Sequence, residues 1–266
     1  MSSNRTADHE VPIHPASTVM LVRDAADGTE VLMLQRTAGA AFGAGMYVFP
    51  GGRVDLADSG PEVETWCHGH DDRSASDRLG IDVGGLAYWV AAVRECFEEA
   101  GVLLASRADG AAHQPHPGDR RAVHDGSVSM AELCGRDDLR LQLGEIHYVD
   151  HWVTPRAAAR RFDTRFFVAA APVEQTAVHD NAETVDSRWV TPADALAMEE
   201  SGELLMMPPT VANLRVLASH QTVAELLAAS AARGRPPRTE PKLRLAADGT
   251  VVGLAMPGDD DYDALD

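Results

Sequence analysis

Cysteine and aromatic residues are scarce in this chain, and negative charge outnumbers positive charge. The 266 residues include 3 cysteines, 5% aromatic residues, and 23 Lys and Arg against 41 Asp and Glu, for a formal net charge of −18. Nonspecific binding to nucleic acid and to anionic membranes is driven by positive charge. We therefore expect no nucleic-acid partner and no membrane partner.

A long apolar run and an N-terminal leader are also missing, although 45% of the residues are hydrophobic. No stretch is long enough to span a bilayer, and no charged segment followed by an apolar one opens the chain. Cys67, Cys96 and Cys134 show no paired spacing, which favours free thiols in a reducing compartment. The final residues Ala264-Leu265-Asp266 do not form a peroxisomal address. We expect a globular protein of the cytoplasm.

The most informative segment begins at Arg94 and reads Arg-Glu-Cys-Phe-Glu-Glu-Ala-Gly-Val. Glu95, Glu98 and Glu99 are spaced i, i+3, i+4, so on a helix their side chains point the same way. Three adjacent carboxylates repel one another and favour a bound cation. Because all the ligands are oxygens, Mg²⁺ or Mn²⁺ suits them better than Zn²⁺. We expect these three glutamates to bind a divalent metal.

The residues around the acids also have helical spacing. An apolar stripe recurs at intervals of four, three and four residues, at Leu86, Val90, Val93 and Phe97. Gly101 is placed to cap the C-terminal end, and Arg94 lies four residues before Glu98, where it can pair with that carboxylate. Cys96 is expected to face packing. The alternative for such a run, a solvated acidic helix face, becomes less favourable once the upstream residues are considered.

Upstream, residues 47–55 read Tyr-Val-Phe-Pro-Gly-Gly-Arg-Val-Asp, a short strand entering a turn. Gly51 and Gly52 permit close approach of the backbone to a ligand or a helix. Gly-Gly followed by Arg-Glu-x-x-Glu-Glu-x-Gly-Val resembles the signature of the Nudix hydrolases. The resemblance implies a loop–helix–loop that binds divalent metal and cleaves a nucleoside diphosphate linked to another group. It also implies an α/β fold, the Nudix α/β/α sandwich with a mixed sheet, here with a C-terminal helical extension.

The signature is interrupted. Arg94 follows Gly52 by 42 positions where the family pattern has about 14, so about 28 residues are inserted, between about Ser59 and Leu86. Their polar content predicts a surface excursion that loops out without disturbing the metal helix, such as a lid or dimer contact. The run Cys67-His68-Gly69-His70-Asp71-Asp72 offers Zn²⁺ ligands as the less favoured alternative. The family's acidic position before the helix would fall on Asp58.

An interrupted signature resembles one branch of the family, which contains a mammalian peroxisomal coenzyme A and acyl-coenzyme A diphosphatase. Residues 42–55, 161–167 and 207–210 resemble that branch as well. The resemblance implies hydrolysis of coenzyme A or acyl-coenzyme A to 3′,5′-ADP and 4′-phosphopantetheine by a metal-activated water. ADP-ribose or a dinucleotide is the alternative substrate, since the same metal helix would serve it. A noncatalytic nucleotide-binding module is a further alternative, which the intact acids disfavour.

Glu183 is the expected catalytic group outside the helix. It lies six residues before Trp189 in a loop that precedes a strand, which resembles the place where family members keep a catalytic or metal-binding glutamate. We expect either Glu95 or Glu183 to be the general base, and Arg94 to support catalysis by holding a carboxylate. Glu145 and Glu174 are the second choices.

An anionic substrate needs local positive charge in so acidic a chain. The candidates at the mouth of the site are Arg36, Arg53 and Arg165. We assign substrate binding to Gly51, Gly52, Arg36 and Arg53. His147 and His151 could flank the site, although a structural, hydrogen-bonded role is the simpler interpretation.

We divide the chain into a flexible N-terminus (1–13), a Nudix domain (14–202), a C-terminal helical extension with a hairpin (203–257) and a mobile acidic tail (258–266). The predicted strands are 17–23, 31–36, 145–153, 163–170 and 187–191, and the predicted later helices are 209–219 and 222–232. Ser129 and Glu132 form a candidate capping box. The apolar segments 204–207 and 223–227 are predicted to be core or dimer interface rather than an acyl-chain groove. The family resemblance makes a homodimer reasonable.

Overall fold

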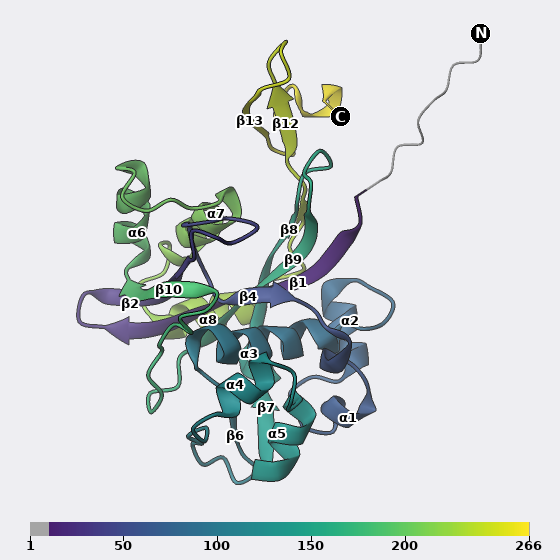
Figure 1. Cartoon of the computed structure of the whole chain (residues 1–266), viewed down its shortest axis with the longest axis vertical. Coiled ribbons are helices and arrows are strands. Elements are labelled where there is room, and N and C mark those ends of the chain that lie inside the picture. Colours follow the sequence, from purple (N-terminus) through teal and green to yellow (C-terminus); the bar gives the residue numbers. More distant parts are fainter. Residues whose placement is uncertain (1–10, 266) are drawn as a thin grey trace.

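The structure is a computed structural model that describes residues 11–265. Within this range an eight-stranded mixed sheet forms the centre, with strands β1 (Ile13–Ala25), β2 (Gly28–Arg36), β3 (Tyr47–Val48), β4 (Gly51–Arg53), β8 (His147–Val153), β9 (Arg161–Ala170), β10 (Thr184–Val190) and β11 (Arg238–Thr239). Its main order is β10-β2-β1-β9-β8-β11, while β3 pairs with β2 and β4 with β1 (Figure 1). β1 runs parallel to β9, which brings the N-terminal strand beside one that is far away in sequence.

Helices cover both faces of this sheet. α3 (Leu86–Ala100) lies on one face, and α6 (Pro192–Glu200), α7 (Pro208–Leu217) and α8 (Val223–Ala232) lie on the other. The strands alternate accordingly: Val19 and Leu21 join the core under α3, whereas Met20 and Val22 join the core under the later helices. The predicted α/β/α sandwich is therefore confirmed. The C-terminal helices do not form an appendage, since they make the second helical layer.

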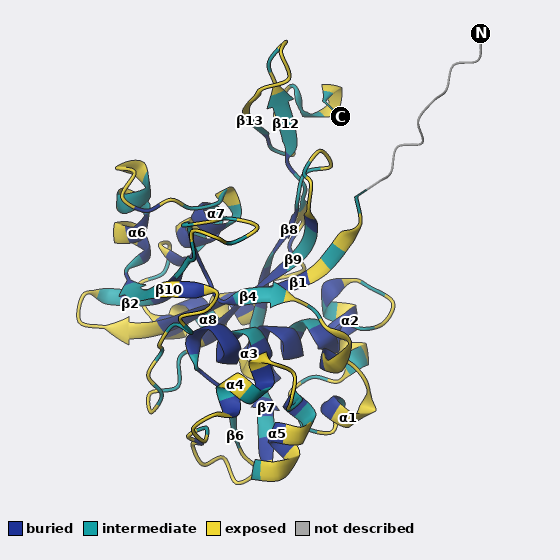
Figure 2. Ribbon diagram, viewed as in Figure 1, coloured by how far each residue is buried: buried dark blue, intermediate teal, exposed yellow. Residues whose placement is uncertain are grey.

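Helix α3 is buried on almost every side (Figure 2). The predicted stripe faces the core, and Cys96 is fully buried, as expected. Trp89 is also buried, and its indole N–H donates to the carbonyl of Ile146 at 2.8 Å. Each large apolar side chain buried in this way contributes about 1.5–3 kcal/mol to folding. Gly101 ends the helix in the left-handed conformation (φ 71°), which confirms the predicted cap.

The other local predictions follow the same pattern. The β1–β2 hairpin turns next to Gly28 at φ 116°, and Ser129 and Glu132 form the expected capping box of α5 (Met130–Asp137). Thr191 and Thr222 cap α6 and α8 with their side chains. Each of these features depends on residues only a few positions apart.

The prediction that the inserted residues loop out is wrong. They form α1 (Pro61–Glu64), β5 (Cys67–His68) and α2 (Asp72–Leu79), and Val63, Ala75 and Leu79 are buried in the same core as α3. The Asp72 carboxylate accepts hydrogen bonds from the backbone N–H groups of Gly84 (3.0 Å) and Leu86 (3.1 Å). The insertion thus holds the start of α3, because a few apolar residues in a polar segment are enough to anchor it.

The candidate Zn²⁺ ligands in the insertion, residues 67–72, make structural contacts instead. Cys67 Sγ donates to the carbonyl of Val63 at 3.3 Å, and Asp71 caps α2 by accepting from Ser74 N–H at 2.7 Å. The ring of His70 lies 5.0 Å from that of Trp89. In the described part of the chain no three His, Cys, Asp or Glu side chains are grouped so that they could hold a metal ion.

A second, three-stranded sheet joins the insertion to later residues. β5 pairs in parallel with β7 (Leu139–Gln142), which pairs with β6 (Ala105–Arg107). The polar stretch after α3 also contains α4 (Asp119–His124), and short 3-10 turns lie at Leu56–Asp58, Leu143–Glu145 and Tyr262–Ala264. None of the helices among residues 11–265 has the length and apolar character needed to cross a bilayer.

The two ends compare differently with expectation. β1 begins at Ile13, at the boundary predicted for the flexible N-terminal segment, and most of that segment, residues 1–10, lies outside the described part. The acidic tail, in contrast, differs from its prediction. The tail after Gly258 folds back on the hairpin of β12 (Lys242–Leu245) and β13 (Val251–Ala255). Arg244 binds Asp259 and Asp261 at 2.7 Å each. These ion pairs offset the repulsion on which the prediction of a mobile tail depended.

Candidate active site

A cavity of about 890 Å³ lies where α3, β1 and β4 meet three other parts of the chain. These parts are the loop 41–46, the β8–β9 connection and the start of α7, with the C-terminal hairpin at the rim. The predicted site residues that line it are Arg36, Gly51, Gly52, Arg53, Arg94, Glu95, Glu98 and Glu183. Glu99 lies next to it, buried beneath β4. The structure therefore brings together the residues assigned to catalysis, metal binding and substrate binding, but not Arg165.

Arg94 is the centre of the polar network. Its Nε and Nη2 donate to the two carboxylate oxygens of Asp58 at 2.8 and 2.9 Å, while Nη1 donates to Glu95 at 2.8 Å and Glu98 at 3.2 Å. Nη2 also donates to the carbonyl of Arg53 at 2.8 Å. The predicted Arg94–Glu98 pair is confirmed. The paired geometry with Asp58, which is 1% exposed, identifies that aspartate as the main support of Arg94.

The two glycines bring β4 against the acidic helix. The N–H of Gly51 donates to Glu99 Oε2 at 3.0 Å. A Cβ atom at Gly52 would lie 2.5 Å from Glu95 Oε1, and one at Gly51 would lie 2.5 Å from the carbonyl of Ser17. A side chain at Gly51 would push β4 away from the backbone of β1, whereas one at Gly52 would displace the Glu95 carboxylate from its present position.

Burial makes these carboxylates costly to ionise. It raises the pKa of Glu95 to about 7, even though Arg94 favours the charged form. The pKa of Glu99 lies well above its ordinary value because the group is buried and also faces Glu95. Burial raises the pKa of Glu98 as well. Although burial disfavours the charge on Arg94, the hydrogen bonds with Asp58 raise its pKa. More negative than positive charge is gathered here.

The donor chemistry of this cluster fits a hard divalent cation. Glu95, Glu98 and Glu99 offer only carboxylate oxygens, and a bound cation would offset the cost of keeping them ionised. As placed, Glu95 and Glu98 are held by Arg94, and Glu99 is held by the N–H of Gly51. Gathering the three around one ion therefore requires changes of side-chain rotamer.

Arg36 and Glu183 complete this end of the cavity. Arg36 Nη1 lies 3.9 Å from Glu99 Oε1, and Arg36 Nη2 lies 4.0 Å from Glu183 Oε2. The Glu183 side chain is 53% exposed, so it can reorient toward a ligand. Its backbone carbonyl accepts from the N–H of Thr37 at 3.0 Å, which ties the loop before β10 to the end of β2.

Several second choices lie elsewhere. Glu145 and Glu174 are exposed and do not line the cavity. Arg165 is not at the mouth, because its position in β9 buries it to 4% exposure, with Nη1 3.6 Å from Asp163. His151 pairs with the same aspartate at 2.6 Å, as expected of a structural histidine. His147 is half-buried outside the cavity.

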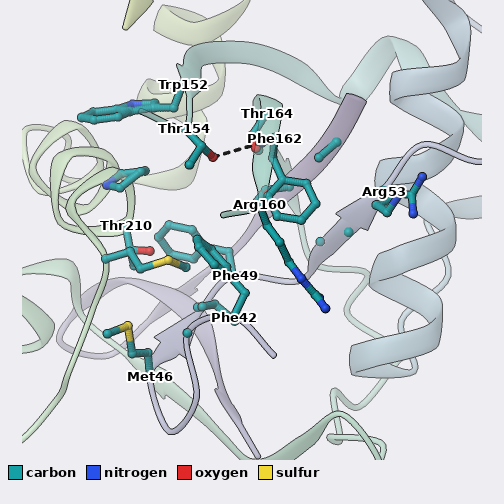
Figure 3. A pocket seen from close by; sticks show the side chains of 18 of the residues that line it. Phe42, Met46, Phe49, Arg53, Trp152, Thr154, Arg160, Phe162, Thr164 and Thr210 are labelled. Atoms are coloured by element: carbon teal, nitrogen blue, oxygen red, sulfur yellow. Dashed lines mark hydrogen bonds between the residues drawn. The ribbon is translucent and has the colours of Figure 1, made fainter. Parts of the chain in front are cut away.

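Apolar side chains form a wall of the same cavity, and the motif reasoning did not assign them (Figure 3). They include Phe42, Phe49, Trp152, Phe162 and Met207. Met207 was predicted to be core or dimer interface, but it lines the cavity. The signal that could have identified this wall is the set of segments 42–55, 161–167 and 207–210, because each of them contributes residues to the cavity.

Three comparisons place the chain among known proteins. Residues 68–217 match the family model of the NUDT19 Nudix domain. The acyl-coenzyme A diphosphatase NUDT19 of Homo sapiens is 30% identical over 89% of this chain and 73% of its own length, and that of Gallus gallus is 28% identical over 88% and 72%. The crystal structure of a Nudix hydrolase from Alicyclobacillus acidocaldarius superposes with a TM-score of 0.71 at 27% identity, covering 82% of this chain and 96% of that one.

The matched region contains α3 with its acids, and the similarity to the human protein extends over most of the chain. Fold, signature helix and sequence similarity agree. The chain belongs to the NUDT19 family of Nudix hydrolases, and it is a Nudix diphosphatase.

Proposed function

We propose that this chain hydrolyses the diphosphate linkage of coenzyme A or acyl-coenzyme A to 3′,5′-ADP and the (acyl-)4′-phosphopantetheine, using Mg²⁺ or Mn²⁺. The observation that carries the proposal is that acids of α3 and a set of apolar side chains line one and the same cavity. Relatives named acyl-coenzyme A diphosphatase support it.

These two sets of side chains suit the two halves of such a substrate. The diphosphate would lie against Glu95 and Glu98, and the pantetheine arm with its acyl group would pack against side chains such as Trp152 and Met207. ADP-ribose or a dinucleotide carries no pantetheine arm or acyl group, so it would leave the part of the wall at Trp152 and Met207 in contact with water, which is unfavourable. The cavity volume of about 890 Å³ is large enough for an extended cofactor.

Glu95, Glu98 and Glu99 would hold the metal. When bound, such a cation supplies Lewis-acid chemistry, because it neutralises charge on the diphosphate oxygens and lowers the pKa of the attacking water. Arg94 keeps Glu95 and Glu98 oriented toward the cavity and is itself held by Asp58. Arg36 is close enough to the acidic end to bind a phosphate oxygen of the substrate.

The proton of the attacking water passes to a carboxylate, either Glu95 or Glu183, since both line the cavity. The Glu183 side chain is 53% exposed, so water reaches it directly, whereas Glu95 lies under Gly52. Replacing each with glutamine and measuring kcat against pH would separate them, because loss of the base removes the acidic limb of the profile.

The decisive test is a panel of diphosphate compounds incubated with purified protein and Mg²⁺ or Mn²⁺, with the products read by mass spectrometry. We expect 3′,5′-ADP and 4′-phosphopantetheine from coenzyme A, and the acylated product from acyl-coenzyme A. Efficient cleavage of ADP-ribose or a dinucleotide with none of coenzyme A would reject the proposed substrate and retain the diphosphatase chemistry.

Two other expectations stay predictions. A homodimer would be detected by sedimentation of the purified protein. A cytoplasmic location, expected from three cysteines that are unpaired in the structure, would be tested by imaging the tagged chain in its native cell.

A further inference from the structure

Four arginines and one histidine line the cavity, counted over the described residues, and they divide into two groups. Arg94, Arg36 and His124 each lie within 4.0 Å of a carboxylate of the acidic end. Arg53 and Arg160 have no carboxylate within ion-pair distance among residues 11–265. In a chain with a net charge of −18, two such guanidinium groups at one cavity are available for an anionic ligand.

The register of the strands places these two arginines on β4 and directly before β9, the two strands that flank the first part of β1. Arg53 pairs with Ala16 across β4 and β1, one position beyond the glycine that contacts Glu95. Arg160 directly precedes β9, which pairs with the start of β1 through Ile13 and Arg161. Figure 3 shows Arg160 extending past Phe162 into the cavity. Both are exposed, so neither is needed for the core.

Aromatic rings lie between them. His14 and Phe162 are register partners on β1 and β9, with ring centroids 6.2 Å apart, and Phe42 lies 5.7 Å from Phe162. Arg53 Nη2 lies 3.1 Å from His14 Nδ1, which joins the arginine to this group of rings. Phe42 remains 39% exposed, so part of its ring faces solvent at the mouth.

We propose that Phe42, Phe162, Arg53 and Arg160 form a subsite for a nucleoside that carries an additional phosphomonoester. The base stacks on the phenylalanine rings, and the two guanidinium groups bind the phosphomonoester. This inference rests on the proposed function, and it assigns the 3′,5′-ADP half of coenzyme A to the mouth beside β1. It makes the second phosphate a requirement for recognition, separate from the diphosphate that is cleaved.

The physical basis is charge-assisted hydrogen bonding. A guanidinium group can present two parallel N–H donors to a phosphate, and stacking on an aromatic ring tolerates either face of a base. The nearby acids Glu95 and Glu98 are occupied by Arg94 and would be neutralised by a metal, so they do not cancel the charges of Arg53 and Arg160. Losing one charge-assisted contact should weaken binding about tenfold.

The test compares ligands that differ only in the second phosphate. Calorimetry measures the binding of 3′,5′-ADP and of 5′-AMP, in the absence of turnover, to the wild type and to the Arg53→Ala and Arg160→Ala variants. We expect the wild type to prefer 3′,5′-ADP by about tenfold or more and each variant to lose most of that preference. Arg160→Lys should retain part of it. Arg156→Ala is the matched control, since Arg156 lies in the same connection, is 74% exposed and does not line the cavity.

Kinetics with coenzyme A and dephospho-coenzyme A give the second measurement. Arg160→Ala should raise KM for coenzyme A about tenfold, with kcat and the KM for dephospho-coenzyme A nearly unchanged. Equal binding of 3′,5′-ADP and 5′-AMP by the wild type, or variants that keep its preference, would overturn the subsite. Failure of the proposed function would give a different result: coenzyme A would not be cleaved, whether or not the protein prefers 3′,5′-ADP to 5′-AMP.

Discussion

The acidic end of the cavity and its mouth are built in different ways. At the acidic end, Glu95, Glu98 and Glu99 come from neighbouring turns of one buried helix. Arg94 holds Glu95 and Glu98, and the N–H of Gly51 holds Glu99. At the mouth, the apolar side chains come from distant segments, since Phe42 lies more than a hundred positions before Phe162 and Met207. Each of the three is at least partly exposed. The acidic end is thus formed by neighbouring residues of one helix and fixed by hydrogen bonds, whereas the mouth is assembled from distant segments and is exposed to solvent.

This difference indicates a division of labour. A buried, cross-linked cluster suits chemistry that must hold charges in fixed positions, whereas an exposed apolar wall suits recognition of a variable group. Mutations at the acidic end should therefore change turnover or stability, and mutations at the mouth should change the choice of substrate. The predictions that follow test this contrast in order of expected effect.

Glu98→Gln and Glu99→Gln should each lower kcat by about a thousandfold, because each removes the charge of a proposed metal ligand. Steady-state assays with Mg²⁺ and Mn²⁺ would measure it. Circular dichroism should show a folded protein, since glutamine has the same shape. Near-normal turnover in both variants would remove these residues from the metal site.

Asp58→Ala should destabilise the protein by about 3 kcal/mol, because it removes the main partner of the buried Arg94. Chemical denaturation would measure the free energy of unfolding. Asp55→Ala is the control: Asp55 lies 3.8 Å from Arg94, but its side chain is 63% exposed, so little change is expected. Equal effects of the two substitutions would contradict the assigned role of Asp58.

Asp72→Ala should cost about 1–2 kcal/mol, since it leaves the N–H groups of Gly84 and Leu86 without their acceptor. The change tests whether the insertion supports the acidic helix. Thermal unfolding of this variant can be compared with that of Asp77→Ala, an exposed acid on the same helix. An unchanged melting temperature for Asp72→Ala would favour the original expectation of an independent excursion.

Met207→Ala should lower the preference for acyl-coenzyme A over free coenzyme A by about fivefold, because it removes apolar surface from the wall. The ratio of kcat/KM for the two substrates is the measurement. Leu205→Ala, at a neighbouring position that is 59% exposed and outside the cavity, should leave the ratio unchanged. A large loss of kcat in Met207→Ala for both substrates would break the proposed separation of recognition from chemistry.

Sequence reasoning succeeded where the determining residues are close together. The periodicity that places Glu95 beside Glu98 and Glu99, the cap at Gly101 and the capping box at Ser129 all act within one or two helical turns. It failed for the insertion, where Val63, Ala75 and Leu79 are too few to stand out from their polar neighbours and yet anchor the segment.

The amino-acid order by itself determined the acidic helix, its polarity and the family to which the chain belongs, because helix geometry converts spacing directly into a shared face. Only the tertiary structure decided what faces those acids. The parallel pairing of β1 with β9 sets His14 beside Phe162, and the packing of α7 brings Met207 to the same cavity. Such contacts depend on strand register and helix packing between distant segments, which no local pattern specifies.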